Sequence, residues 1–382
     1  IDLMPEWKKK INSKIAENNL PVEAGEVLWK VAEDSANYSF NKSHSLSYAT
    51  LSAWTLYLKF KYPQEFFLSL LSLTKFEPDP QNEINNISQD LPHFDIRLLP
   101  PDLGKSSMDF DKEGKNIRFG LNSIKGVSEK SLEALSKFRK SKTPNKFDVF
   151  VAAKQAGLNI GILASLIQAG CLSGAEASRP LLVLECQAFN LLTDREKRNI
   201  ILLGGKFNYK LLDIMLAAKE GLIADDGKPI MKESRFNTFK SKYDKYKEVY
   251  LQNRQFEKFA NWFFERKLLG YSYSEDLKSV FKDGNLILNS IDYNNMEDRR
   301  TGKFIGVVED SFKGVSRTGN AYLKILMSDE YGKYVVMLCD NRRYQRYTEY
   351  YNSSSAKTPK KDDVISVFGS KSGDALFAEN IS

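Results

Sequence analysis

The sequence predicts a multidomain α+β fold with a helical N-terminal region, a helix-hairpin-helix domain and a small C-terminal β-barrel of the OB-fold type. Three observations support this prediction. Apolar residues recur with a helical period in the first part of the chain, "IKGVSEKSL" places a glycine turn directly before a helix, and the C-terminal part alternates as strands do. With 382 residues, the chain is also longer than one core usually supports.

The N-terminal region, residues 1–75, is expected to be helical. Its apolar residues in "PVEAGEVLWKVAEDSANYSF" recur near a period of 3.6, and Pro63 opens the helix "PQEFFLSLLSL", where its missing N–H costs nothing. Residues 76–120 are expected to form a linker with a short hairpin. Within it, Pro100-Pro101 forces extended backbone, and Lys112-Glu113-Gly114-Lys115 forms the hairpin turn.

Residues 121–200 are expected to form a tandem helix-hairpin-helix domain that binds DNA. In "LNSIKGVSEKSLEALSKF", a tight turn at Gly126-Val127 precedes a helix that opens at Ser128. Such a turn presents backbone N–H groups at a helix N-terminus, where they bind a phosphate whatever the base sequence. Lys125 and Lys130 would add positive charge. An ordinary helical turn remains the alternative, because Ser128 replaces the second glycine usual in such hairpins.

A second, degenerate copy of the hairpin is found in "GLNIGILASLIQAGCLSG". Its turn at Gly170 lacks nearby basic residues, so this copy is expected to pack rather than to bind. Residues 201–300 follow as a helical connecting region that is rich in lysine and aromatic residues, with a loop at Asp225-Asp226-Gly227-Lys228-Pro229.

Residues 301–382 change to a strand period. The segments "KFIGVVEDSF", "AYLKILMSD", "KYVVMLC" and "DVISVFGS" alternate or are rich in β-branched residues, "GVSRTGN" forms a turn, and "DNRRYQRYTEYY" is a helix after the third strand. Three strands, a helix and two further strands predict the five-stranded OB-fold. Phe312, Arg317 and Tyr322 are the residues expected to stack on or steer a single DNA strand.

Composition sets limits on the class of protein. Lysine and arginine exceed aspartate and glutamate, giving a formal charge of +7, which suits a polyanionic partner without requiring one. Three distant cysteines fit neither a disulfide framework nor a zinc site and are expected to be reduced core residues. No membrane-length apolar run and no secretory leader are found, so a cytoplasmic protein is expected. The first residue is Ile, which predicts a fragment or a processed part of a larger protein.

No catalytic or metal-binding residue is predicted in this chain. It has no phosphate-binding glycine loop, no His-Glu-x-x-His and no dinucleotide fingerprint, and two histidines cannot build a three-histidine site. Asp109-x-Asp111 has the spacing with which two-metal enzymes hold magnesium from a strand, but no third carboxylate partner is identified. Solvated ends of a hairpin are the favoured interpretation of this pair.

The segment "FNKSHSLSYAT" gathers hydrogen-bond donors directly before a helix. Asn41, Lys42, Ser43, His44 and Ser45 supply amide, ammonium, hydroxyl and imidazole groups for an anion, to which the helix N-terminus adds its dipole. The alternative is a capping segment in which Ser43 or Ser45 is the N-cap.

This segment, followed by "LLPPDLGKSSMDF", "IRFGLNSIKGVSEKSLEAL", "LASLIQAGCLS" and "FERKLLGYSYSEDL", resembles the C-terminal half of the alpha subunit of bacterial-type replicative DNA polymerase, family C (DNA polymerase III alpha). The resemblance implies that residues 1–75 are part of the fingers, that 121–200 grip product duplex and that 301–382 lie near the single-stranded template. It makes Asn41 to Ser45 the contacts of the incoming nucleoside triphosphate, with Lys42 and His44 the main ones. The palm, with the catalytic aspartates and their Mg²⁺, would lie before residue 1.

Some features depart from this family. "QFEKF" is the nearest approach to a clamp-binding motif and fits it poorly, so binding to the sliding clamp is left open, and Glu275-Asp276 replaces the usual His-Pro. Two hypotheses result. The chain is the DNA-binding and nucleotide-contacting portion of a DNA-directed DNA polymerase, a nucleotidyltransferase that is inactive without a palm on another segment or subunit, with primer-template DNA as its partner. The alternative is a stand-alone, non-catalytic DNA-binding or scaffold protein.

Overall fold

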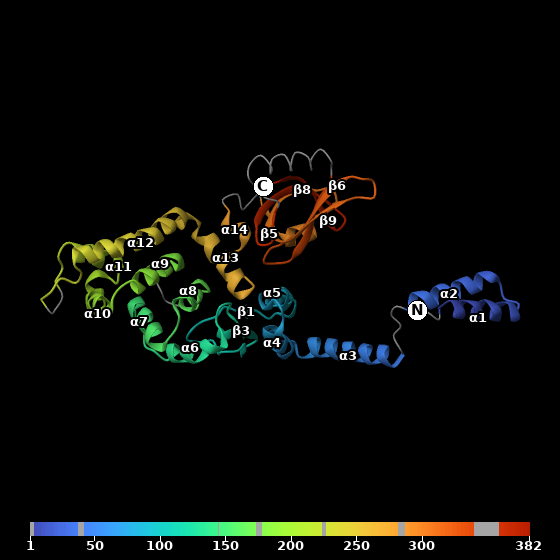
Figure 1. The fold of residues 1–382 in the computed structure, drawn as a ribbon, viewed down its shortest axis with the longest axis horizontal. Helices are drawn as coiled ribbons and strands as arrows, with labels where there is room; N and C mark the ends of the chain where they lie inside the picture. The colour runs from blue at the N-terminus through green and yellow to red at the C-terminus, as the bar shows by residue number, and fades with distance from the viewer. Residues whose placement is uncertain are drawn as a thin grey trace. The chain divides into compact units, whose positions relative to one another are not determined.

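The computed structural model describes residues 4–36, 42–143, 145–172, 178–223, 227–281, 287–339 and 359–382. The chain divides into two compact units, Ile1–Pro63 and Gln64–Ser382, each of which is described by itself (Figure 1). The expected multidomain α+β class is confirmed, because helices occupy most of the chain and a closed barrel forms its C-terminal part.

The first unit contains three helices: α1 (Met4–Glu17), α2 (Val22–Ala36) and α3 (Lys42–Lys61). Asn19 turns the chain between α1 and α2 with a positive φ of 52°, and these two helices pack on each other. Among the described residues of this unit, Ile15 is the one apolar side chain that is buried. Helix α3 therefore exposes its large apolar side chains, including Trp54 at 65% and Phe60 at 71%.

The second unit begins with helices and a small sheet. Pro63, the last residue of the first unit, opens α4 as expected. Asp79 caps α5 with its carboxylate, and Pro80 occupies the first turn of that helix. The expected hairpin is also found, because β2 and β3 pair antiparallel around Gly114, which has a φ of +61°. The elements are α4 (Pro63–Leu73), α5 (Pro80–Asp90), β1 (Leu98–Leu99), β2 (Asp111–Glu113) and β3 (Asn116–Arg118).

We define the helical body as residues 64–281, and its described part contains nine further α-helices. Side-chain caps mark several of their N-termini, such as Asn145 before α7 and Thr193 before α10, where Glu196 completes a capping box. The helices are α6 (Leu132–Arg139), α7 (Lys146–Ala156), α8 (Ile160–Gln168), α9 (Arg179–Asn190), α10 (Asp194–Leu203), α11 (Leu211–Lys219), α12 (Glu233–Asn253), α13 (Glu257–Leu269) and α14 (Leu277–Val280).

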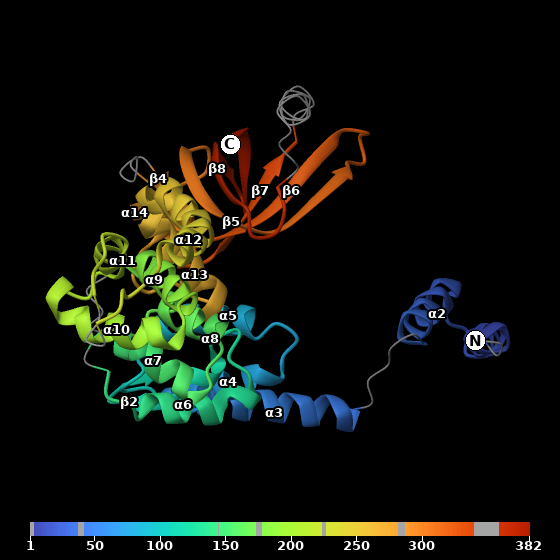
Figure 2. The ribbon, with the colours of Figure 1, turned by 60° about the vertical axis from the view of Figure 1, so that its left-hand side comes forward.

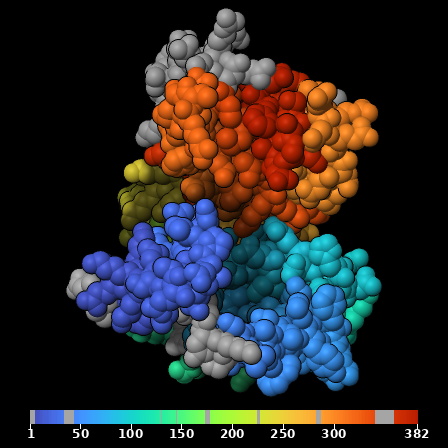
Figure 3. All heavy atoms as spheres, turned by 90° about the vertical axis from the view of Figure 1, so that its right-hand side faces the viewer, coloured from blue at the N-terminus to red at the C-terminus, as the bar shows by residue number. Residues whose placement is uncertain are grey.

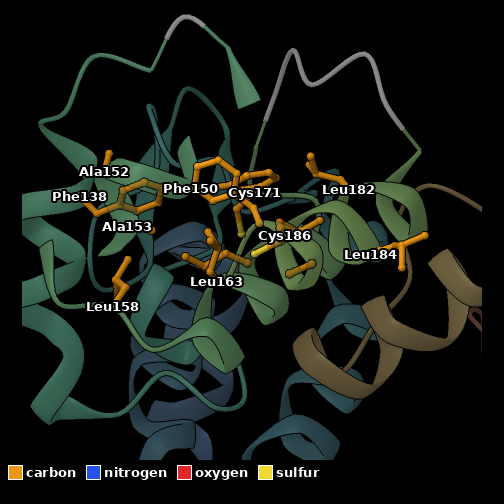
Figure 4. Packing of buried hydrophobic residues seen from close by; sticks show 14 of the residues in the cluster. Phe138, Phe150, Ala152, Ala153, Leu158, Leu163, Cys171, Leu182, Leu184 and Cys186 are labelled. Atoms are coloured by element: carbon orange, nitrogen blue, oxygen red, sulfur yellow. The ribbon is translucent and has the colours of Figure 1, made fainter. Parts of the chain in front are cut away.

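One hydrophobic core runs through the helical body. Phe138 of α6, Phe150 of α7, Leu163 of α8 and Leu182 of α9 gather in it (Figure 4). Cys171 and Cys186 are buried here as free thiols, which confirms the expectation of core cysteines for these two, whereas Cys339 is half-buried.

The C-terminal strands form a closed five-stranded barrel. The hydrogen-bonded order is β5-β6-β7-β9-β8, and β8 pairs back on β5 to close the circle. All pairings in the circle are antiparallel except β7 with β9, the order of an OB-fold. The strands are β5 (Thr301–Val315), β6 (Ala321–Ser328), β7 (Lys333–Leu338), β8 (Val364–Ser372) and β9 (Ala375–Ile381). Figure 3 shows the barrel, orange to red, as a lobe of its own.

Two short elements precede the barrel and were not predicted: β4 (Ile287–Leu288), which pairs parallel with β5, and α15 (Ser290–Asn295). The helix expected in 340–351 lies outside the described residues, as does part of the loop expected at 225–229. Among the described residues, no helix combines the length and the apolar composition needed to cross a membrane.

Helix α13 joins the helical body to the barrel (Figure 2). A bulge in β5 at Glu309 interrupts the pairing with β6, and the carboxylate of Glu309 accepts a hydrogen bond of 2.5 Å from Arg266 of α13. The indole N–H of Trp262, fully buried on the same helix, donates to Glu330, which also accepts from the backbone N–H of Leu277 at 3.1 Å.

The carboxyl of Glu330 makes this joint sensitive to pH. Burial raises its pKa to about 7, and the neighbouring Asp329 adds to the rise. The folded-state pKa lies above the ordinary value of 4.5, so the stability that this proton contributes is complete below that value and is lost as pH rises through 7.

Glu330→Gln should therefore stabilise the protein at about pH 8 by up to about 3 kcal/mol and have little effect at about pH 4. The amide oxygen can still accept from the Trp262 indole. Urea unfolding at the two pH values measures the difference, with Glu297→Gln on the exposed surface as the control. An equal effect at both pH values would contradict the assignment.

Candidate nucleic-acid interface

The first hairpin turn, residues 124–128, is anchored by apolar side chains that are buried in the core. Leu121 and Ile124 before the turn, and Leu135 and Phe138 after it, are all buried in the core of the helical body. Gly126 has a φ of +95°, a conformation that favours glycine. The N–H of Lys125 donates to the carbonyl oxygen of Leu268 at 2.9 Å, which fixes the turn to the end of α13.

The space above Gly126 is open. A Cβ built on this glycine would meet only the hydroxyl of Ser165, at 3.4 Å, which is an ordinary contact. A ligand can therefore approach the backbone closely at this position.

The three predicted N–H donors of this turn are not equivalent. Val127 donates to the carbonyl of Ile124 at 3.0 Å, and Ser128 donates to the hydroxyl of Ser131 at 3.0 Å. Among the described residues, the N–H of Gly126 has no acceptor. A phosphate here could therefore accept a hydrogen bond from the N–H of Gly126 directly. The N–H of Ser128 would become available only if the Ser131 hydroxyl rotated away from it.

Lys125 and Lys130 flank the turn on its exposed side. Neither is paired with a carboxylate among the described residues, in contrast to Lys137, which forms an ion pair of 2.7 Å with Glu133 one turn earlier. The positive charge of both lysines is therefore available to an external anion.

The second hairpin turn, residues 169–172, is covered. The hydroxyl of Tyr273 donates to the carbonyl of Ala169 at 3.0 Å and accepts from Arg179 at 3.0 Å. A Cβ on Gly170, whose φ is +77°, would lie 1.9 Å from that hydroxyl. The expectation that this copy packs is therefore supported. The expectation that it lacks a nearby basic residue is wrong in space, because Arg179 reaches it from α9.

The predicted nucleotide-contacting segment lies at the start of α3. Asn41 lies outside the described residues, and Lys42 and Ser43 are described by their backbone alone. His44 is exposed, and its ring packs edge-on against Tyr48 at 4.5 Å between centroids. The capping alternative does not fit, because α3 begins at Lys42 and so contains both Ser43 and Ser45.

The barrel brings its three predicted residues together in one hairpin. Phe312 of β5 and Tyr322 of β6 lie 6.1 Å apart between ring centroids, and Arg317 is in the turn that joins the two strands. Phe312 is 56% exposed. The ring of Tyr322 lies over Gly314, where a Cβ would come within 2.5 Å of it. This pair of rings offers a stacking surface for bases.

Asp109 and Asp111 do not point to a shared ligand. Asp109 accepts from the amide of Asn122 at 2.8 Å, whereas Asp111 accepts from the hydroxyl of Ser107 at 3.0 Å. The residues that the structure describes contain no group of three metal-binding side chains.

Comparison with known proteins gives this geometry a context. The helix-hairpin-helix motif family matches residues 95–182, which contain both glycine turns. A protein named DNA polymerase III subunit alpha from Aquifex aeolicus is 37% identical over 181 residues, and one from Thermus aquaticus is 32% identical over 188 residues. These matches cover 47% and 48% of this chain. The chain is related to the DNA polymerase III alpha subunits.

The relationship concerns a part of those proteins. The matched region spans 15% of the length of each of these two alpha subunits. A third protein of the same name, from Mycoplasma genitalium, is 34% identical over 36% of this chain and 15% of its own length. A crystal structure of a domain of replication protein A from Methanococcus maripaludis aligns with 25% of this chain and 92% of its own, at 16% identity and a TM-score of 0.19. A likeness that low carries no conclusion.

The two hairpin glycines of this alpha-subunit relative should respond differently to one added methyl group. Both Gly126→Ala and Gly170→Ala pay roughly 1–2 kcal/mol for a side chain at positive φ. Gly170→Ala must in addition displace Tyr273 and its two hydrogen bonds, each worth about 1 kcal/mol, so it should lose about 3–4 kcal/mol of unfolding free energy. Urea denaturation of the two variants measures this, and equal losses would show that Tyr273 does not cover the turn.

Proposed function

We propose that this chain is the DNA-binding and nucleotide-contacting portion of a replicative DNA polymerase, and that it acts with a palm carried by another segment or subunit. The observation that carries this proposal is the open glycine turn at Gly126, with unpaired Lys125 and Lys130 beside it, in a relative of DNA polymerase III alpha subunits. Backbone N–H and lysine contacts of this kind bind phosphates without reading bases, as a polymerase requires of its duplex grip.

The exposed apolar surface of the first unit favours this function over a stand-alone scaffold. Monomeric soluble proteins rarely leave a large contiguous apolar surface in water. Helix α3 exposes apolar and aromatic side chains along its whole length: Leu46, Tyr48, Leu51, Trp54, Leu56, Tyr57, Leu58 and Phe60. A helix with this many large apolar side chains is normally covered, so we infer that α3 packs against other protein structure in the assembled polymerase.

The proposed division of labour follows the domain limits predicted from the sequence. Residues 1–75 act as part of the fingers, 76–120 as a linker, 121–200 as the duplex grip, 201–300 as a connection and 301–382 as the single-strand contact. The exposed His44 at the start of α3 contacts the nucleoside triphosphate together with Asn41, Lys42, Ser43 and Ser45. In this proposal the Mg²⁺ ions of catalysis are held by the palm, which another segment or subunit carries.

A primer-extension assay tests the enzymatic part. The chain alone should not extend a primer with template, Mg²⁺ and nucleotides, since two-metal transfer needs acidic ligands. In a complete polymerase that contains this chain, His44→Ala should lower single-turnover kcat/KM for nucleotide by about 10- to 100-fold, the loss expected for a charge-assisted hydrogen bond. His93→Ala, which removes the other histidine from an exposed site, is the control. Robust extension by the chain alone would overturn the proposal.

A binding assay tests the DNA part. Lys130→Ala should weaken binding to blunt duplex equally for all sequences and lower the salt dependence by about one unit, because one phosphate contact is lost. Lys219→Ala, which removes an exposed lysine from the end of α11, is the matched control and should have no effect. Phe312→Ala and Tyr322→Ala should instead weaken binding to single strands by about 1–3 kcal/mol each and spare duplex binding. If Lys130→Ala binds duplex DNA as tightly as the parent does, the proposal that the first hairpin grips the duplex is wrong.

A further inference from the structure

A cleft of about 230 Å³ lies between the first hairpin turn, α5, α13 and the barrel. Figure 3 shows a recess between the barrel and the teal part of the helical body. The cleft is lined by residues from all four elements, among them Asn85 of α5, Lys125 of the turn, Lys267 of α13 and Glu309 of β5. The predicted duplex grip, through Lys125, and the strand that carries Phe312, through Glu309, therefore border one cleft.

The cations of the cleft divide into paired and unpaired ones. Arg266 is engaged by Glu309 at 2.5 Å, and Lys361 lies 3.6 Å from Asp79. Lys125 and Lys267, by contrast, have no carboxylate partner among the described residues, although the carboxylate of Asp362 also lines the cleft. The charges sum to +1, since four cations face three carboxylates, and the excess rests on the two unpaired lysines.

A backbone contact brings the main chain at these two lysines close together. The N–H of Lys125 donates to the carbonyl of Leu268, the residue after Lys267, at 2.9 Å. Gly270 then lets the end of α13 approach α5, because a Cβ at this glycine would lie only 2.2 Å from the carbonyl oxygen of Gln81. The same close approach brings Asn85 to this end of α13, its backbone nitrogen 3.3 Å from that Cβ position.

Asn85 is the second observation that points to a ligand. Its side chain is only 4% exposed and lines the cleft, yet its amide makes no hydrogen bond with any residue that the structure describes. This amide is not one of the described side-chain groups that lack both a hydrogen-bond partner and access to water, so it faces the cleft, where a ligand can reach it. Among the described residues, the cleft therefore holds one amide without a hydrogen-bond partner and two ammonium groups without a carboxylate partner, of which that of Lys267 lies 5.6 Å from the centroid of the Phe263 ring.

We propose that this cleft holds one backbone phosphate of a DNA strand that passes from the first hairpin to the barrel. Lys125 and Lys267 supply charge-assisted hydrogen bonds to the phosphate oxygens, and the amide of Asn85 supplies a third. A DNA strand is favoured over a free anion because β5 borders the cleft at Glu309 and carries Phe312 three residues further along. This inference rests on the proposed DNA-binding function and adds the site at which duplex gives way to single strand.

Two variants of the full 382-residue chain test it. Lys267→Ala should weaken binding to a duplex with a single-stranded template overhang by about threefold to tenfold and lower its salt dependence by about one unit. Binding to a blunt duplex of the same length should change little. Lys258→Ala, which removes a lysine from the same helix outside the cleft, is the matched control. Asn85→Leu should weaken overhang binding as well, while its thermal unfolding temperature stays equal to that of the parent or rises.

The outcomes separate this inference from the function on which it rests. If Lys130→Ala weakens duplex binding while Lys267→Ala and Asn85→Leu leave overhang binding unchanged, the grip stands and the cleft site is wrong. If inorganic phosphate protects the parent from thermal unfolding, and Lys267→Ala removes that protection without affecting DNA, the cleft is a free-anion site and the inference is also overturned. A parent chain that binds no DNA refutes both.

Discussion

The carboxylate of Glu265 is the interaction on which the arrangement of the second unit depends. It is completely buried on α13 and accepts hydrogen bonds from Arg179 at 2.5 Å and from the backbone N–H groups of Tyr273 and Ser274 at 2.8 and 3.0 Å, with the hydroxyls of Ser272 and Ser274 completing the shell. An isolated buried charge would be very costly, whereas one with these partners is tolerated only in this geometry. The site therefore fixes the loop after α13 and the start of α9 in one position.

Helix α13 transmits that constraint to both the hairpins and the barrel. On one side, Glu265 holds Arg179 and Tyr273 over the second hairpin, and the Leu268 carbonyl holds the first hairpin at Lys125. On the other side, Arg266, the next residue of the same helix, donates a hydrogen bond to Glu309 in the bulge of β5. Consecutive residues on one rigid helix thus set the distance between hairpins and barrel, a geometry that loops alone would leave variable.

The sequence predicts the local part of this structure and misses the distant part. Period and turn chemistry located the helix that opens at Pro63, the hairpin at Gly114 and the strands of the barrel, because each depends on neighbouring residues. The pair of Arg179 with Glu265 spans 86 positions, so no local pattern reveals it. Lys267 and Asn85 were missed for the same reason, since neither belongs to a motif and only the approach at Gly270 brings their helices together. Strand β4, with two residues, is too short to show a period.

The two hairpins show why a glycine turn does not by itself define a phosphate site. Gly126 and Gly170 both have positive φ, and both lie within the residues that match the helix-hairpin-helix motif. At Gly170 the absent side chain makes room for the Tyr273 hydroxyl, which comes from the protein itself, whereas at Gly126 the space stays open to solvent. A glycine in such a turn lets another group approach the backbone closely. That group can be a side chain of the protein, as at Gly170, or a bound ligand. The distinction lies in α13 and the loop after it, which cover one turn with a tyrosine and leave the other exposed beside two unpaired lysines.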